Sequence, residues 1–197
     1  MRILVTGCHG FIGTSFSAFA RGQGHEIAGV GLSAQLPADW RGPYHQADLS
    51  RTDLSDVIRQ FAPDAVLHAA GPASVSMSFA APLDDFRVSM LTWANLLDSV
   101  RRSGMHPLIV YPSSAAVYGN PTALPITEDS TVAPISPYGY HKAACEMLAR
   151  EYSECFGLDV LVARIFSTYG PRQHRLLLWE LYMQATNAAP EIVLQGT

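Results

Sequence analysis

Short, unbroken apolar runs alternate along the chain with longer segments in which apolar residues recur every three to four positions. The runs are typical of buried parallel strands, and the segments between them are typical of amphipathic helices. Strands are predicted at residues 3–5, 26–30, 108–111 and 158–165, and a short third strand is predicted before Asp48. Residues 65–71 are predicted to form the fourth strand together with the turn that follows it. Strands that alternate with helices in this way predict an α/β fold built on a doubly wound parallel sheet.

Two long helices are predicted in the middle of the chain. Residues 82–102 show a strong amphipathic pattern, and Ser136 followed by Pro137 starts a second helix over residues 137–156. The Ser136 hydroxyl can accept a backbone N–H, and the proline ring suits the first helical position. The core candidates on the first of these helices are Phe86, Met90, Trp93, Leu96, Leu97 and Val100. A further helix is predicted over residues 172–187 and a short strand over residues 192–194.

Tyr138 falls in the first turn of the second helix, and Lys142 follows four residues later. On a helix this spacing places the phenol and the ammonium on one face. A tyrosine hydroxyl titrates near pH ~10 unaided, so a nearby cation and the positive end of the helix would both help it to act near neutrality. Because Lys142 is the only lysine in the chain, its position favours this pairing over a solvated helix lysine.

A glycine-rich turn links the first strand to a helix that runs through Arg21. Glycines at positions 7, 10 and 13 allow a tight turn, close approach of the backbone to a pyrophosphate, and packing of the helix on the sheet. The helix N-terminus supplies positive potential to the phosphates. The turn therefore predicts a dinucleotide-binding site, with Gly-x-x-Gly-x-x-Gly spacing.

The end of the second strand leaves the choice between NAD and NADP open. Gly31, Leu32 and Ser33 occupy the place where an acidic residue would bind the ribose 2′-hydroxyl, and no arginine stands beside them. Asp48 and Leu49 have two interpretations: they bind the adenine edge, or Asp48 or Ser50 caps the next helix.

His68, in the fourth strand, is interpreted as a strand-end histidine with satisfied hydrogen bonds rather than as a catalytic group.

Composition narrows the function classes. A chain of 197 residues with 48% apolar and 15% charged residues fits one domain, or one domain and part of another. A net charge of -4 and the lack of a Lys/Arg run argue against a nucleic-acid or membrane partner. Cys8, Cys145 and Cys155 form no C-x-x-C pair, so reduced thiols and no metal site are predicted. The first residues show no targeting pattern, which predicts a cytoplasmic protein.

Five motifs together resemble the extended short-chain dehydrogenase/reductases, specifically the NAD-dependent epimerase/dehydratase family that acts on nucleotide sugars. They are Thr6–Gly13, His68–Gly71, Ser113–Gly119, Ser136–Lys142 and Arg164–Gln173. The resemblance implies an NAD(P)-binding Rossmann domain over residues 1–171. It also implies the start of a substrate-binding domain over residues 172–197, the rest of that domain being largely missing.

The resemblance also implies roles for individual residues. Ser114, Tyr138 and Lys142 would form a catalytic trio. The residues expected to bind the cofactor are Gly7, Gly10, Phe11, Ile12, Gly13, Ser33, Asp48, Leu49, Ala69, Ala70, Gly71, Ser89, Tyr138 and Lys142. The residues expected to bind the nucleotide-sugar substrate are Ser114, Ser167 and Arg172. For Arg172 and Arg175 two interpretations stand: contact with a substrate diphosphate, or a solvated helix start.

The activity implied is epimerisation at C4 of the sugar through a transient 4-keto intermediate, with reduction of a 4-keto sugar nucleotide as the alternative. Ala115 and Ala116 replace the Asp-Glu pair that dehydrating members carry, which argues against a dehydratase. A non-catalytic dinucleotide-binding or assembly module is a third alternative. Family members often dimerise through the helices that correspond to residues 82–102 and 137–156, so a homodimer is expected.

Three further departures from the family pattern concern the fit of the substrate. Ser89 and Ser167 each stand where the family usually has asparagine, and Thr92-Trp93 replaces a usual Gly-Thr.

Overall fold

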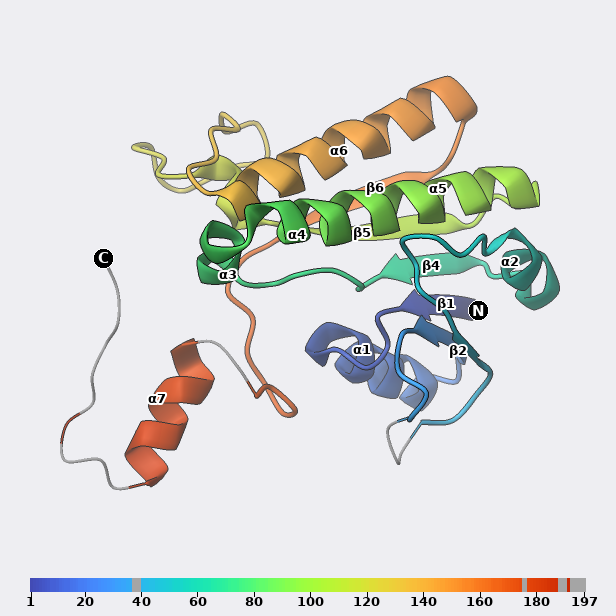
Figure 1. Cartoon of the computed structure of the whole chain (residues 1–197), viewed down its shortest axis with the longest axis horizontal. Coiled ribbons are helices and arrows are strands. Elements are labelled where there is room, and N and C mark those ends of the chain that lie inside the picture. Colours follow the sequence, from blue (N-terminus) through green and yellow to red (C-terminus); the bar gives the residue numbers. More distant parts are fainter. Residues whose placement is uncertain (37–39, 175–176, 188–190, 192–197) are drawn as a thin grey trace. The chain divides into compact units, whose positions relative to one another are not determined.

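A computed structural model describes residues 1–36, 40–174, 177–187 and 191. The chain divides into two compact units, an N-terminal unit, Met1–Phe166, and a C-terminal unit, Ser167–Thr197. The N-terminal unit holds the sheet and the helices around it, and the C-terminal unit contains helix α7, Leu177–Thr186 (Figure 1). The predicted strand over residues 192–194 lies outside the described residues.

The N-terminal unit is built on a six-stranded sheet in which every neighbouring pair of strands is parallel. The strands are β1 (Arg2–Thr6), β2 (Glu26–Gly31), β3 (Tyr44–Gln46), β4 (Ala65–His68), β5 (Leu108–Ser114) and β6 (Val160–Ile165). Their order is β3-β2-β1-β4-β5-β6. The order reverses between β1 and β4, and ligands of such sheets bind at the carboxyl ends of the strands beside this reversal. The predicted fold class is confirmed.

The helices of the N-terminal unit are mostly short connections, apart from three longer ones. They are α1 (Phe11–Gly22), α2 (Ser55–Phe61), α3 (Val75–Ala80), α4 (Pro82–Phe86), α5 (Thr92–Ser103) and α6 (Pro137–Phe156), with a π-helical turn η1 (Arg87–Leu91) and a 3₁₀ turn η2 (Ala115–Tyr118). In Figure 1, α5 and α6 run side by side, and the two helices are in contact.

Two apolar layers form because successive strand residues point to opposite faces of the sheet. Leu4 of β1 packs into the layer that contains residues of α2, α5 and α6. Its neighbours Ile3 and Val5 pack into a second layer with Ala20 of α1. The continuous apolar runs in the sequence therefore correspond to strands that are covered on both faces.

The predicted helix over residues 82–102 is helical but not uniform, because η1 interrupts it between α4 and α5. Four core candidates are confirmed as fully buried: Trp93, Leu96, Leu97 and Val100. Met90 is only partly buried. The prediction that Phe86 belongs to the core is wrong, because 43% of its surface is exposed. A π turn holds one residue more than an α turn, so Asp85 before the turn and Ser89 within it are buried, and Phe86 is not.

Helix α6 begins and ends as the sequence predicts. The Ser136 hydroxyl accepts a hydrogen bond from the Gly139 backbone N–H at 3.1 Å, and Pro137 occupies the first turn. Gly157 then ends the helix with a left-handed backbone, φ 70°. The N-terminal cap fixes the turn on which Tyr138 lies.

The predicted helix over residues 172–187 is shorter in the structure. Arg172 has a left-handed backbone, φ 75°, and lies in a turn, and α7 begins at Leu177. A left-handed residue does not continue a right-handed helix, so the interpretation of Arg172 as a helix start is wrong. Arg175 lies outside the described residues.

Two glycines of α1 give a matched test of this packing. A Cβ on Gly13 would lie 2.4 Å from the Gly7 carbonyl oxygen and 2.8 Å from the Cys8 Cα, whereas a Cβ on Gly22 would meet nothing within 4 Å. We expect Gly13→Ala to lower the free energy of unfolding by about 2 kcal/mol, and Gly22→Ala to raise it by up to about 1 kcal/mol. Urea unfolding measures both, and equal stability of the two variants would contradict the close packing.

Candidate active site

The turn after β1 brings two backbone segments into close contact. Gly7 has φ 65°, and a Cβ there would lie 2.5 Å from the backbone nitrogen of Ala70, beyond the end of β4. The Gly10 N–H donates to the Gly7 carbonyl at 2.9 Å, and Gly10 begins α1 without a side-chain cap. The N–H groups at this helix end are thus left for an anionic ligand.

A cavity of about 780 Å³ opens beside this turn. Its volume lies within the range typical of small-molecule and cofactor sites. Eight of the predicted cofactor residues line it: Gly7, Gly10, Ser33, Asp48, Leu49, Ala69, Ala70 and Gly71. They come from the carboxyl ends of β1, β2 and β4 and from the loop after β3, so the fold gathers them from four separate stretches of sequence.

Four other predicted cofactor residues are placed differently. Phe11, Ile12 and Gly13 form the first turn of α1, and Ser89 lies in η1. None of the four lines the cavity. Ser89 is buried, and among the described residues its hydroxyl has no hydrogen-bond partner.

The cavity is also lined by residues that were not predicted from the sequence, among them His9, Arg51 and Leu91. His9 Nε2 donates to the Gln35 carbonyl at 2.9 Å, and the ring packs edge-on against Tyr44 at 5.2 Å. A Cβ at Gly31 would lie 3.0 Å from His9 Nδ1, so the ring lies close to the end of β2. The position of His9 inside the glycine-rich turn was the one feature of the sequence that indicated a place at the cavity.

Asp48 forms a local turn and does not cap a helix. Its Oδ1 accepts from the backbone N–H of Ser50 at 3.0 Å and from the Ser50 hydroxyl at 2.6 Å, and these bonds lower the pKa of the Asp48 carboxyl. Helix α2 begins at Ser55 with Leu54 before it. The interpretation of Asp48 or Ser50 as its cap is therefore wrong.

Ser114, Tyr138 and Lys142 meet at the carboxyl end of β5. Ser114 is the last residue of that strand, and its side chain lies close enough to Tyr138 to lower the pKa of the phenol. Lys142 Nζ donates to the Pro112 carbonyl at 2.8 Å and lies 5.8 Å from the centre of the Tyr138 ring. The predicted sharing of one helix face by Tyr138 and Lys142 agrees with this geometry.

The electrostatics of this cluster follow from its burial. Burial raises the pKa of Tyr138, while the hydrogen bond from Ser114 lowers it and the charge of Asp85 raises it further. Burial lowers the pKa of Lys142, whereas interactions with Cys145, Asp85 and Glu146 raise it by a smaller amount. Burial thus favours the protonated form of Tyr138, and a role as proton acceptor requires positive charge near the phenol.

An ion pair braces the strand that carries Ser114. Glu146 of α6 accepts a hydrogen bond from the Ser113 hydroxyl and pairs with Arg164 of β6, whose Nη2 lies 2.8 Å from Oε2. Arg164 also donates to the Tyr118 hydroxyl at 2.9 Å. This network joins α6 to β5 and β6 next to the cluster.

His68 lies beneath the cluster, fully buried. Its Nδ1 is 2.8 Å from the Thr6 hydroxyl, but its buried Nε2 has no partner among the described residues, so the prediction of satisfied hydrogen bonds holds for one nitrogen only. The ring lies against Trp93, at 5.1 Å, and Tyr111, at 6.1 Å. Burial, aided by the charge of Lys142, lowers the pKa of His68 to about 3.

The predicted substrate residues fall in both units. Ser114 belongs to the cluster in the N-terminal unit, whereas Ser167 and Arg172 belong to the C-terminal unit.

The cysteines are free: Cys8 and Cys145 are buried, and Cys155 is exposed. Within the described part of the chain, no group of three or more His, Cys, Asp and Glu side chains gathers as metal ligands would. No helix in these same ranges is both long and apolar enough to cross a membrane.

Comparisons with known proteins assign the chain to a family. The model of the NAD dependent epimerase/dehydratase family matches residues 3–197. Two curated relatives are a UDP-glucose 4-epimerase from Mycolicibacterium smegmatis, 32% identical over 181 residues, and a GDP-6-deoxy-D-mannose reductase from Pseudomonas aeruginosa, 33% identical over 174. The alignments cover 88% and 87% of this chain but 58% and 54% of the relatives. The chain thus spans little more than half the length of either relative.

Among solved structures, the UDP-glucose 4-epimerase of Thermus thermophilus in complex with NAD superposes with a TM-score of 0.83 at 32% identity. The match covers 94% of this chain and 61% of that chain. This coverage agrees with the prediction that the substrate domain is largely missing from the sequence.

The buried His68 makes stability depend on pH. With a folded-state pKa near 3 and an unfolded value of about 6.5, only the unfolded chain gains a proton as the pH falls between these values. We expect stability to fall by up to about 1.4 kcal/mol per pH unit below about pH 6.5 from this residue alone. His68→Gln should remove that part of the slope in urea unfolding between about pH 7 and about pH 5; parallel curves for both proteins would contradict the assignment.

Proposed function

Because the chain belongs to the NAD dependent epimerase/dehydratase family, we propose that it carries the cofactor-binding and proton-transfer machinery of a nucleotide-sugar epimerase. The reaction proposed is inversion at C4 of the sugar through a transient 4-keto intermediate. The observation that carries the proposal is the meeting of Ser114, Tyr138 and Lys142 at the end of β5. A module under no catalytic demand would have no need of all three groups at one end of the strand.

The glycine-rich turn and the cavity fit a nicotinamide dinucleotide. The start of α1, which no side chain caps, offers backbone N–H groups to a pyrophosphate, and the cavity beside it, which Asp48 helps to line, suits the adenosine half. When bound, the cofactor supplies the acceptor and donor of hydride. Solved relatives that contain NAD support that choice, although the end of β2 carries no carboxylate at Gly31, Leu32 or Ser33 to exclude NADP.

The three clustered side chains divide the proton chemistry between them. The Tyr138 phenolic oxygen takes the proton of the sugar hydroxyl as the carbonyl forms and returns it when the carbonyl is reduced. The Ser114 hydroxyl donates to the same sugar oxygen and holds Tyr138 in place. The Lys142 ammonium, fixed by the Pro112 carbonyl, stabilises the phenolate through its charge.

Reduction of a 4-keto sugar nucleotide is the second candidate, favoured by the similarity to GDP-6-deoxy-D-mannose reductase. It would use the same trio once and release oxidised cofactor. Ala115 and Ala116 give no acid or base for the elimination of water, so a dehydratase has less support. Heating the purified chain and identifying any released dinucleotide by mass spectrometry separates the two: retained cofactor favours the epimerase, and an empty site favours the reductase.

We also propose a homodimer formed through the surface of α4, η1 and α6. Several large apolar side chains are exposed there, namely Leu83, Phe86, Tyr140 and Met147. Exposed apolar surface of this kind is typical of protein contacts. Sedimentation equilibrium should give the mass of two chains, and the mass of one chain would refute the dimer.

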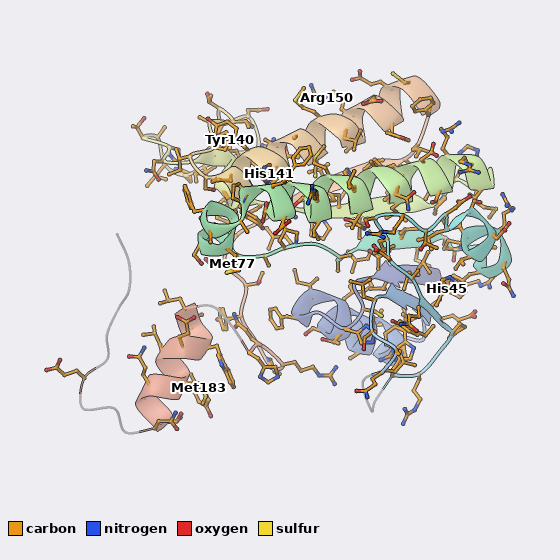
Figure 2. All side chains as sticks on the ribbon, viewed as in Figure 1. His45, Met77, Tyr140, His141, Arg150 and Met183 are labelled. Carbon is orange, nitrogen blue, oxygen red and sulfur yellow. The ribbon has the colours of Figure 1, made fainter. Side chains whose placement is uncertain are left out.

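Tyr138→Phe tests the mechanism, with Tyr140→Phe as a matched control. Both tyrosines lie near the start of α6, but Tyr140 is 61% exposed, and it is labelled in Figure 2. We expect Tyr138→Phe to lower the conversion of UDP-glucose to UDP-galactose by about 100-fold or more while NAD affinity, measured by calorimetry, stays unchanged. The control should match the wild type, and full turnover by Tyr138→Phe would disprove the mechanism.

A further inference from the structure

Beside the catalytic cluster, a buried carboxylate pairs with a histidine. Asp85 of α4 is 6% exposed, and its Oδ2 lies 2.5 Å from Nδ1 of His141 on α6. Since an ionised carboxylate only accepts hydrogen bonds, Nδ1–H of His141 is the donor. Oδ1 of Asp85 is buried and has no partner among the described residues. Figure 2 labels His141 near the start of α6, the helix that packs on α4.

This arrangement is costly if stability is its only role. A buried polar group loses its hydration, and this loss costs free energy unless hydrogen bonds within the protein replace the water. An oxygen left without a hydrogen bond adds a further penalty of about 1–3 kcal/mol. The inward position of Asp85 follows from the π turn of η1, so the same backbone feature that excludes Phe86 from the core places a charge in it.

The groups that face Asp85 come chiefly from α6. Tyr138, Lys142 and Cys145 all feel its charge, which raises the pKa of each. Helix α3, which also packs on α4, has no titratable side chain. From η1 comes Arg87, which pairs at 3.7 Å with the exposed Asp84.

Lys142 itself is faced by few other charges. Cys145 and Glu146 on α6 favour its ammonium form, the Tyr111 ring of β5 lies 4.7 Å from Nζ, and His68 of β4 is held neutral. Because burial works against the ammonium, each nearby negative group helps to keep it charged.

We propose that Asp85 and His141 form a positioning pair for the catalytic cluster. The hydrogen bond joins α4 to α6 at the residue directly before Lys142, and it places a carboxylate beside the turn that carries the ammonium. His141 orients the carboxylate and supplies its hydrogen-bond donor. The catalytic meaning of the pair depends on the function proposed above, but the link between Asp85 and Lys142 does not.

The single lysine makes this link directly measurable. In protein labelled with ¹³C-lysine, one side-chain signal reports the titration of Lys142 by NMR, with no assignment needed. Asp85→Asn keeps an amide oxygen that can accept from His141 but removes the charge, so we expect the Lys142 midpoint to move to lower pH. Asp84→Asn is the control, because Asp84 is exposed and its charge does not act on Lys142. Its midpoint should equal that of the wild type.

Variants of His141 test the other half of the pair. His141→Asn keeps an N–H donor, so the titration midpoint of Lys142 in this variant should equal that of the wild type. His141→Leu removes the donor, which makes the buried carboxylate easier to neutralise. In His141→Leu the titration midpoint of Lys142 should therefore move to lower pH, as in Asp85→Asn. His141→Leu provides the same test if Asp85→Asn does not fold.

Equal midpoints in Asp85→Asn and Asp84→Asn, or in His141→Leu and the wild type, would overturn the proposal. Thermal unfolding of each variant shows whether it is folded at the pH of measurement. The titration needs no substrate, so a wild-type chain that fails to turn over nucleotide sugars refutes the proposed function and leaves this test intact. Where turnover is present, the acid limb of kcat/KM for Asp85→Asn should move to lower pH, since Tyr138 then ionises more readily.

Discussion

The close approach of the turn after β1 to the end of β4 is the constraint on which the rest of the N-terminal unit depends. At Gly7 even a methyl group would overlap the backbone of Ala69 and Ala70, and at Gly13 it would overlap Gly7 itself. These contacts allow α1 to start directly above the sheet, with its uncapped N–H groups at the reversal of strand order. The cavity exists at this point because no side chains fill the meeting place of the strands.

The second half of the site depends on burial rather than on close backbone approach. Lys142 is partly buried and donates to the carbonyl oxygen of Pro112 rather than to a carboxylate. Its charge is therefore weakly compensated, which favours nearby negative charge, including a phenolate at Tyr138. Burial alone works the other way on both groups, raising the pKa of Tyr138 and lowering that of Lys142. The balance between these effects decides whether proton transfer is possible near neutrality.

Local signals in the sequence predicted most of the fold and the centre of the site. Ser136 and Pro137 fixed the start of α6, and with it the spacing of Tyr138 and Lys142, because a helix cap is a short-range interaction. His9 and Arg51 were not selected, because they reach the cavity only through the arrangement of separate loops. The later start of α7 was not predicted either. Arg172 has a left-handed backbone, and an arginine, unlike a glycine, does not indicate that conformation in a sequence.

The most informative failure is Phe86. Apolar residues at 86, 90, 93, 97 and 100 fit a regular helix, and nothing in that pattern reveals an extra residue in one turn. The π turn changes which residues before and within it are buried, so the Phe86 ring is exposed and polar Asp85 and Ser89 are buried. As a result, Asp85 Oδ1 and Ser89 Oγ are buried without a hydrogen-bond partner among the described residues. Because the same turn brings a negative charge toward the only lysine of the chain, the departure from a regular helix is better explained by the needs of the site than by packing.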